Sequence, residues 1–242
     1  MIENYKDCPV LCEIERSKTP RISQVPIDEY VEMVDRNFDY DFTGRSEFYP
    51  YILPDCIKNN EIDYDILVIT GASGSGKSTL LSNFSFYDKN KKEFDCTKAI
   101  VSNFATPDDA CERLSAVGLN SMPVWCRPRN VLSVGEGFRA DLALNINSNT
   151  VFDEFTSTID RNVAKSTCHS ISKYIRDKKM HRIVFCSCHN DYIEYLNPDI
   201  VIDLNDEKIY DCRDTDLGKT LLFTSANRPT RACGEYLGDI TI

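Results

Sequence analysis

One stretch decides the fold of this chain: Ile66-Leu67-Val68-Ile69-Thr70-Gly71-Ala72-Ser73-Gly74-Ser75-Gly76-Lys77-Ser78-Thr79-Leu80-Leu81. An apolar run predicts a strand, which leads through a glycine-rich turn into a helix. The turn has the form G-x-x-x-x-G-K-S, which is typical of a phosphate-binding loop. Glycines let the backbone N–H groups surround an anion, and the following helix presents its positive end to the same place. A chance glycine turn is the alternative, but the flanking strand and helix favour the loop.

This loop predicts ATP and Mg²⁺ as ligands. Lys77 is expected to reach the β- and γ-phosphates, and the Ser78 hydroxyl is expected to bind Mg²⁺. The residues that we expect to bind the nucleotide here are Gly71, Ala72, Ser73, Gly74, Ser75, Gly76, Lys77, Ser78 and Thr79. Phe48-Tyr49-Pro50-Tyr51 precedes the loop, and its rings either stack on adenine or pack on the sheet.

Length and composition are those of one folded α/β domain. The chain has 242 residues, of which 42% are hydrophobic and 27% charged, and no apolar run approaches the roughly 20 residues that cross a bilayer. We expect a single domain over residues 1–242: an irregular N-terminal portion (1–62), a nucleotide-binding core (63–210) and a C-terminal tail (211–242). Residues 1–7 show no basic segment followed by an apolar one, so we expect a cytoplasmic protein without a membrane partner.

Charge and cysteine content narrow the function classes. The net charge of −10 argues against a surface that coats duplex nucleic acid, because such binding needs many Lys and Arg contacts. One basic cluster either forms a local groove or, as we favour, a solvated helix end; it consists of Lys173, Arg176, Lys178, Lys179 and Arg182. The eleven cysteines are odd in number and lack paired C-x-x-C spacing, so we expect reduced thiols, mostly in the core, and no zinc site.

Hydrophobic spacing predicts the remaining elements. We expect helices over residues 27–34, 107–114, 138–144 and from Asp160 onward, the last with Val163, Thr167, Ile171 and Ile175 on its buried face. We expect strands over 10–14, 98–102, 150–152, 182–188 and 199–204, an antiparallel return over 207–210, and a packed strand at 221–223. Residues 122–129 are expected to form an irregular connection. The fold class is therefore α/β, a P-loop nucleoside-triphosphatase with a mainly parallel sheet flanked by helices and a smaller antiparallel N-terminal portion.

A second chemical signal follows the strand at residues 150–152. Asp153 and Glu154 come at its carboxyl end, and we expect this strand to lie next to the loop strand. Asp153 is then placed to hold the Mg²⁺ shell and Glu154 to orient the attacking nucleophile. His189 ends another strand on the same edge, where it suits contact with the γ-phosphate.

The order of these pieces resembles the ABC-type ATPases. Five motifs fall in that family's order over residues 60–210: the loop at 71–78, Leu132-Ser133-Val134-Gly135-Glu136, Val151-Phe152-Asp153-Glu154, Ser157-Thr158-Ile159-Asp160 and His189. The resemblance implies that Ser133 and Gly135 belong to a signature turn that contacts nucleotide. It also implies that the catalytic residues are Glu154, Asp153, His189 and Lys77, and that Ser78 and Asp153 bind the metal.

A narrower resemblance points away from transport. Residues 153–157, 188–191 and 197–199 look like a small non-transporter branch seen in phages and prokaryotes. Val134 replaces the usual signature glycine, no glutamine loop is evident between Ser78 and Leu132, and that interval is short for the usual helical arm. The resemblance thus implies action in the host cytoplasm if the chain is phage-encoded, with DNA or a DNA-processing protein as partner and an ATP-dependent homodimer as one possibility.

Three functional classes stay open at this point. In the first, Glu154 polarises water and ATP hydrolysis drives a change in a partner. In the second, Glu154 or Asp153 activates a hydroxyl, and the chain is a kinase that acts on a modified base such as 5-hydroxymethyluracil in DNA hypermodification. The same residues serve either acceptor, because phosphoryl transfer depends mainly on positioning and charge neutralisation. A nucleotide-gated binding protein without turnover is the third class, which the two acids disfavour.

Overall fold

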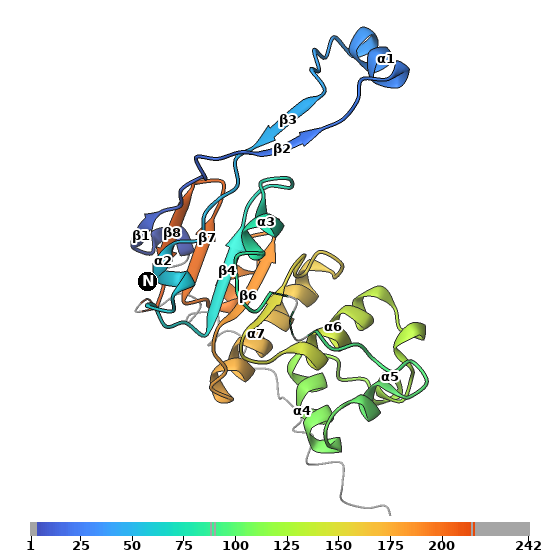
Figure 1. The fold of residues 1–242 in the computed structure, drawn as a ribbon. Helices are drawn as coiled ribbons and strands as arrows, with labels where there is room; N and C mark the ends of the chain where they lie inside the picture. The colour runs from blue at the N-terminus through green and yellow to red at the C-terminus, as the bar shows by residue number, and fades with distance from the viewer. Residues whose placement is uncertain (1–3, 88, 90, 214, 216–242) are drawn as a thin grey trace, which may run out of the picture.

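A six-stranded sheet forms the centre of the computed structural model, which describes residues 4–87, 89, 91–213 and 215 (Figure 1). The strand order is β1-β8-β7-β4-β6-β5. The strands are β1 (Val10–Glu13), β4 (Ile66–Thr70), β5 (Thr150–Phe152), β6 (Ile183–Ser187), β7 (Ile200–Asp203) and β8 (Lys208–Asp211). β4 to β7 are parallel, whereas β8 and β1 add an antiparallel edge. The predicted α/β class with a mainly parallel sheet is confirmed.

The two central strands are buried along their whole length. β4 pairs with β6 from Ile66 opposite Ile183 to Thr70 opposite Ser187. Their near-continuous apolar sequence follows from burial on both faces of a parallel sheet. Alternate residues feed two apolar clusters, one containing Val68 and Phe185 and the other containing Leu67 and Val184.

Helices cover both faces of this sheet. They are α2 (Asp55–Lys58), α3 (Lys77–Leu81), α4 (Pro107–Ala116), α5 (Met122–Trp125), α6 (Val134–Asn145), α7 (Arg161–Asp177) and α8 (Ile193–Leu196), with 3-10 turns η1 (Tyr5–Asp7), η2 (Ile100–Asn103) and η3 (Arg129–Val131). The long helix α7 packs through Ala164, Cys168, Ile171 and Ile175, which are fully buried, whereas the expected Val163 is only partly buried. In the part of the chain that the structure describes, no helix has the length and apolar character needed to cross a membrane.

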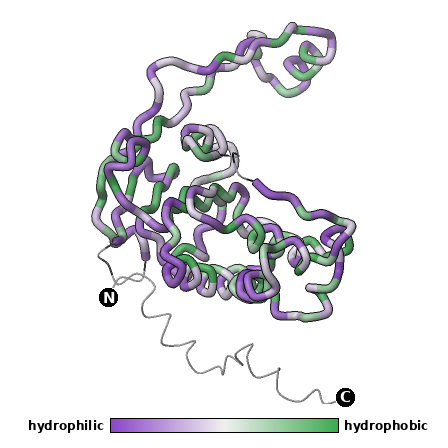
Figure 2. Tube along the Cα trace, turned by 60° about the horizontal axis from the view of Figure 1, so that its bottom comes forward, coloured by the Kyte–Doolittle hydropathy of each residue, from purple (hydrophilic) through white to green (hydrophobic). Residues whose placement is uncertain are grey.

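An N-terminal arm projects from this body (Figures 1 and 2). It consists of β2 (Arg21–Gln24), β3 (Arg45–Phe48) and, between them, α1 (Glu29–Phe38). β2 and β3 pair only with each other, as an antiparallel sheet, and no residue of α1 is buried. The smaller antiparallel N-terminal portion and the helix expected near residues 27–34 are therefore confirmed.

Two expectations about local structure are wrong. The expected strand at 98–102 is the 3-10 turn η2, because the Asn103 side chain bonds to Asp95 N and Ala99 O and holds this segment in a turn. The connection at 122–129 contains the short helix α5.

The cysteines are mostly placed as expected. Of the ten described, four are buried in the two apolar clusters and three more pack against them; these seven are Cys8, Cys168, Cys186, Cys212, Cys12, Cys56 and Cys111.

The strand order corrects a third expectation. β5 does not lie next to β4, because β6 lies between them. The crossover through α7 carries the chain from β5 back toward the centre of the sheet, and this choice of direction is not written in the local sequence. The expected strand at 221–223 lies outside the described residues.

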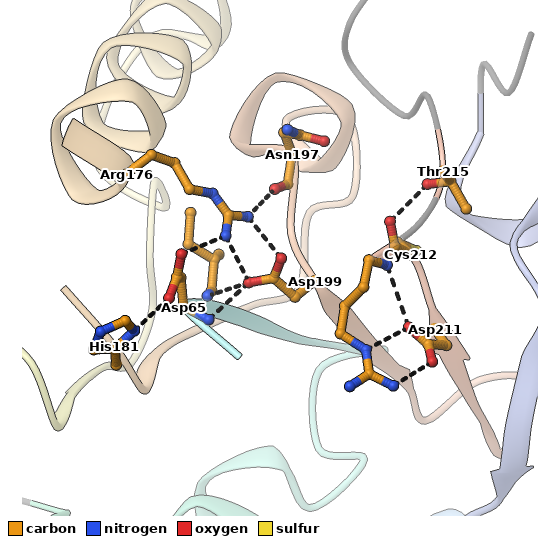
Figure 3. Close-up of polar contacts among 10 residues, drawn as sticks. Asp65, Arg176, His181, Asn197, Asp199, Asp211, Cys212 and Thr215 are labelled. Carbon is orange, nitrogen blue, oxygen red and sulfur yellow. Dashed lines mark hydrogen bonds and ion pairs between the residues drawn. The ribbon is translucent and has the colours of Figure 1, made fainter. Parts of the chain in front are cut away.

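A network of charges joins the amino ends of β4 and β7 (Figure 3). Arg176 of α7 donates to Asp65 at 2.6 Å and to both carboxylate oxygens of Asp199 at 2.8 and 3.0 Å. Asp199 also accepts from the backbone N–H groups of Asp65 and Ile66, and His181 Nδ1 lies 2.6 Å from Asp65 Oδ1. Burial lowers the pKa of Arg176, but its bonds to Asp199 and Asp65 raise that pKa overall.

This network changes the interpretation of the basic cluster. Arg176 is paired as above, Lys178 forms an ion pair with Glu112, and the Arg182 guanidinium lies over the Phe86 ring at 5.0 Å. The favoured solvated helix end is therefore wrong for Arg176 and Arg182, whose guanidinium groups contact other parts of the fold. It holds for Lys173, Lys178 and Lys179, which are exposed, and the pair of Lys178 with Glu112 lies at the surface, where it contributes little stability.

Candidate nucleotide-binding and catalytic site

The predicted phosphate-binding loop joins the end of β4 to the start of α3. Gly76 has a φ of 96°, and a Cβ atom there would lie 2.7 Å from the Phe48 ring, so only glycine fits. The Ala72 N–H donates to Asn205 Oδ1 at 2.9 Å, which fixes the start of the loop against the β7–β8 turn. The Ser75 hydroxyl is buried without a hydrogen-bond partner among the described residues. An orphaned donor in a glycine-rich loop fits a site for phosphate oxygens.

Lys77 lies inside this loop. Only 6% of the residue is exposed, and its ammonium donates to the carbonyl oxygens of Gly71 at 2.9 Å and Ala72 at 2.8 Å. Burying an ammonium is costly unless it is fully hydrogen-bonded or paired with an anion. The loop therefore concentrates a positive charge at the point where the backbone N–H groups converge. The remaining expected loop residues, Ser73, Gly74 and Thr79, lie in the same turn or in the first turn of α3.

The two expected metal ligands meet directly. Ser78 Oγ donates to Asp153 Oδ2 at 2.9 Å, although the residues are 75 positions apart and their strands are not neighbours. Asp153 reaches across the end of β6, where the small Cys186 thiol lies against its carboxylate; burial and then this carboxylate raise the pKa of that thiol. A hydroxyl and a carboxylate are hard oxygen ligands of the kind that Mg²⁺ takes alongside substrate phosphates. The donor set thus fits Mg²⁺ with a nucleotide.

No protein-only metal cage accompanies this pair. In the part of the chain that the structure describes, no three His, Cys, Asp or Glu residues are grouped as a metal site. Mg²⁺ sites that include phosphate need only one or two protein ligands. The pair of Ser78 and Asp153 is compatible with that type of site.

The turn after β5 aims Glu154 into solvent. Glu154 has a φ of 52° and Thr156 a φ of 65°, both unusual for residues with a Cβ. The Glu154 N–H donates to Asp153 Oδ1, its carbonyl accepts from Ser157, and its exposed side chain has no partner among the described residues. Strained backbone that the surroundings hold in place is common at functional sites. The carboxylate is accordingly available to a ligand.

Arg161 holds this turn and connects it to the end of β6. Its Nη1 donates to the carbonyl and hydroxyl oxygens of Thr156 at 3.2 and 3.3 Å, and the rest of its guanidinium pairs with the Asp191 carboxylate. The hydrogen bond to Asp191 raises the pKa of Arg161, and its counterpart lowers the pKa of Asp191. One side chain therefore links the Glu154 turn to the segment that carries His189.

His189 lies where the sequence placed it, just past the end of β6. Its backbone N–H donates to Ser187 Oγ at 3.1 Å, and its exposed imidazole makes no hydrogen bond to a described residue. Lys77, Ser78, Asp153, Glu154 and His189 thus share the carboxyl edge of the sheet.

The predicted signature residues lie apart from the loop. Ser133 caps α6 in a capping box with Glu136, whose pKa is lowered by the Ser133 backbone and then by its hydroxyl. Gly135 lies against Ile159, since a Cβ on it would be 3.4 Å from that side chain. Ser133 is exposed, and neither it nor Gly135 hydrogen-bonds to residues 71–79 among the described contacts. The structure therefore does not bring these two residues into the same site as Lys77.

The aromatic stretch before β4 was expected either to stack on adenine or to pack on the sheet, and its rings differ in this respect. Tyr51 is buried, donates to Leu204 O and carries the Arg16 guanidinium 4.1 Å from its ring, so it packs on the sheet. Phe48 is partly exposed and lies against Gly76 of the loop. Stacking on a base is therefore open to Phe48, not to Tyr51.

A cavity of about 580 Å³ opens beside the outer edge of β5. It is lined by residues of the 86–96 segment, by α6 and by residues 149–153, so that Asp153 is part of its wall. No sequence pattern predicted this cavity, because its walls come from parts of the chain that are far apart in the sequence. Arg161 was also missed, since a single Arg after a helix cap carries no signal of its own.

Comparison with solved structures shows which fold this site belongs to. The chain is similar to the ATP-binding cassette MJ0796, a dimer in a post-hydrolysis state bound to ADP and Pi, with 13% identity, a TM-score of 0.51, and 83% of this chain and 99% of that chain covered. A second structure of MJ0796, described as a bacterial ABC transporter cassette, matches with 13% identity, a TM-score of 0.47, and 68% and 89% covered. No protein-family model and no curated protein sequence matches the chain. At this identity the likeness is one of architecture, and the chain has the fold of an ABC-type P-loop cassette.

Proposed function

We propose that this protein binds Mg-ATP and hydrolyses it. The observation that carries the proposal is the hydrogen bond from Ser78 to Asp153, which joins the two motifs expected to share a metal ion. Mg²⁺ bound with ATP would neutralise charge on the β- and γ-phosphates. The likeness to a cassette bound to ADP and Pi supports the same activity by analogy of fold.

The residues divide the work by position. Lys77 and the loop N–H groups hold the phosphates, while Ser78 and Asp153 hold the metal. Glu154 orients the attacking water and His189 contacts the γ-phosphate; both side chains are exposed at the same edge and free of described partners. Asp153 keeps its orientation through the Ser78 and Glu154 hydrogen bonds. Ser133 and Gly135 reach nucleotide only across an ATP-dependent homodimer, in which one copy's α6 faces the other copy's loop.

A kinase is the second candidate, and the cavity beside β5 favours it. Asp153 lines that cavity as well as the proposed metal site, so a hydroxyl bound there would lie near the γ-phosphate. An acceptor such as a hydroxymethylated base in DNA, and a role in DNA metabolism as a non-transporter, stay predictions that rest on the sequence motifs.

The fate of γ-labelled phosphate tests both candidates. The protein is incubated with Mg²⁺ and γ-labelled ATP, alone and with DNA that carries ordinary or hydroxymethylated bases. Hydrolysis predicts label released as free phosphate in every sample, whereas the kinase predicts label on the hydroxymethylated DNA. Lys77→Ala should abolish both, and Lys58→Ala, a change on the surface of α2, should leave them unchanged. Tight ATP binding retained by Lys77→Ala would contradict the proposed site.

A further inference from the structure

The cavity beside β5 has the size and the firm walls of a ligand site. Its volume of about 580 Å³ lies within the range of pockets for small molecules. The walls are held by contacts of their own. Asn145, which is buried, donates to Lys92 O at 3.1 Å and accepts from Lys92 N at 2.7 Å. These two hydrogen bonds fix the backbone at Lys92 to α6.

The cations in the wall suit an anion. Lys89, Lys91 and Lys92 line the cavity, and none of them forms an ion pair with a described residue. Arg129 donates two hydrogen bonds to the Asp141 carboxylate, at 2.8 and 2.6 Å. Its guanidinium occupies the space that a Cβ on Gly137 would need. The wall also carries the carboxylates of Glu93 and Asp153, but with Arg129 and Asp141 paired, the three lysines without an ion pair among the described residues leave a local excess of positive charge in a chain with a net charge of −10. Ammonium groups on flexible stems are common phosphate binders.

The aromatic side chains in the wall suit a planar ring. Phe138 and Phe152 line the cavity and are anchored from behind, Phe138 by Phe155 at 6.0 Å and Phe152 by a stacked contact with Phe185 at 5.3 Å. Phe94 lines it too and packs edge-on against Phe104. Rings held in this way present fixed apolar surfaces. Stacking on such surfaces is how proteins bind nucleobases without reading their sequence.

We propose that this cavity binds a phosphorylated nucleoside, with the base among Phe94, Phe138 and Phe152 and the phosphate on Lys91 and Lys92. The ligand is either a free mononucleotide or the phosphorylated end of a single strand. Asp153, which lines the cavity and accepts from Ser78, brings this ligand next to the proposed ATP site. Only that last relation rests on the proposed function; binding in the cavity does not require ATP turnover.

Cys96 offers a direct readout of occupancy. It is exposed and lines the cavity together with Arg129. Alkylation of Cys96 by N-ethylmaleimide is followed by peptide mass spectrometry. Thymidine monophosphate should slow it several-fold, whereas thymidine alone or inorganic phosphate should slow it much less. Cys126 is exposed outside the cavity and should react at an unchanged rate.

Two further experiments distinguish a free mononucleotide from a nucleic-acid end, and the cavity from the phosphate-binding loop. Protection by an oligothymidylate with a terminal phosphate at lower concentration than the mononucleotide would identify a nucleic-acid end as the ligand. Protection that persists in Lys77→Ala would show that the probe is not bound in the phosphate-binding loop. Failure of ATP hydrolysis in the same preparation would then count against the proposed function alone.

A charge reversal provides the matched test. Lys91→Glu with Lys92→Glu should abolish protection of Cys96. Lys58→Glu with Lys173→Glu, an equal charge change at exposed positions outside the cavity, should retain it. Buried Cys168 stays unreactive in each variant that is folded. Unchanged protection in the Lys91 and Lys92 variant, equal protection of Cys126, or no protection by any probe would each overturn the proposal.

Discussion

The two edges of one sheet use their charges in opposite ways. At the amino ends of β4 and β7, Asp199 accepts from two backbone N–H groups and two guanidinium nitrogens of Arg176 (Figure 3). At the carboxyl ends, Glu154 and His189 extend into solvent without a hydrogen-bond partner among the described residues. Glu154 follows β5 and His189 follows β6, so the two groups of charges lie at opposite ends of one sheet. Paired charges lock the architecture, and unpaired ones are available for a ligand.

The largest effect is expected from substituting Glu154 at the carboxyl edge of the sheet, where its side chain is unpaired. Glu154→Gln should lower ATP hydrolysis by about 1000-fold, the order expected when a positioned acid–base group is lost. Stability should stay within about 0.5 kcal/mol of the parent, because the side chain is exposed and forms no hydrogen bond or ion pair with a described residue. Phosphate release and chemical denaturation measure the two quantities, with Glu61→Gln, an exposed acid elsewhere, as control.

The same variant tests the homodimer. If α6 of one copy completes the site of another, Glu154→Gln should trap an ATP-bound dimer that gel filtration with light scattering detects. Unchanged hydrolysis would remove Glu154 from the mechanism. A monomer at saturating ATP would instead confine nucleotide contacts to one chain and leave Ser133 and Gly135 without their expected role.

The opposite result is expected at the paired edge. Arg176→Met should destabilise the fold by about 2 kcal/mol, since it leaves two carboxylates without their partner; this value is discounted because 32% of the Arg176 side chain is exposed. Activity per folded molecule should not change. Denaturation midpoints at constant slope measure the first quantity. Lys173→Met, on the same helix and exposed, is the control, and a loss of turnover without a loss of stability would reverse the assignment of the two edges.

Sequence patterns captured what is local along the chain. The strand into the loop, the cap of α7 at Asp160 and the acids after β5 follow from turn, cap and burial preferences within a few residues. The position of β6 between β4 and β5 does not, because it depends on where the α7 crossover returns the chain. Ile100 and Val101 favour a strand by their own propensity, but contacts made by Asn103 override it.

At the candidate site, too, the sequence predicted local features but not long-range contacts. The motif residues could be named from the sequence, whereas Arg161 could not, because its partners lie 5 and 30 positions away and are brought together only by the fold. The cavity beside β5 was missed for a related reason: its walls come from separate parts of the chain, among them residues 91–96, α6 and residues 149–153, which only the fold brings together. Long-range placement, not residue type, decides both features.

Arg161 connects the two kinds of charge. It is paired with Asp191, and it also donates to Thr156 in the turn that carries the unpaired Glu154. Arg161→Met should lower kcat about tenfold with little change in KM, because the Glu154 turn loses its support at Thr156 and shifts by a fraction of an ångström. Arg161→Lys keeps the charge without the fork and should restore only part of the rate. An unchanged kcat in Arg161→Met would show that the turn holds itself.

The smallest effect is a pH dependence of the pair that Arg161 makes with Asp191. The hydrogen bond to Arg161 lowers the pKa of Asp191 in the folded state below its ordinary value near 3.9. Stability from this pair is therefore present above about pH 4 and is lost as the pH falls through the lower, folded-state pKa. Because both side chains are about one-third exposed, the contribution should be below about 1 kcal/mol.

Asp191→Asn isolates that contribution. Denaturation midpoints of the parent and Asp191→Asn should differ at pH 7 and converge as the pH is lowered below about 4, since the parent carboxylate is then protonated and resembles the amide. Salt should shrink the difference at pH 7, as it does for part-exposed pairs. A difference that stays constant from pH 7 down to pH 3 would mean that Asp191 acts through packing, and that the charges linking the Glu154 turn to the His189 segment contribute no stability.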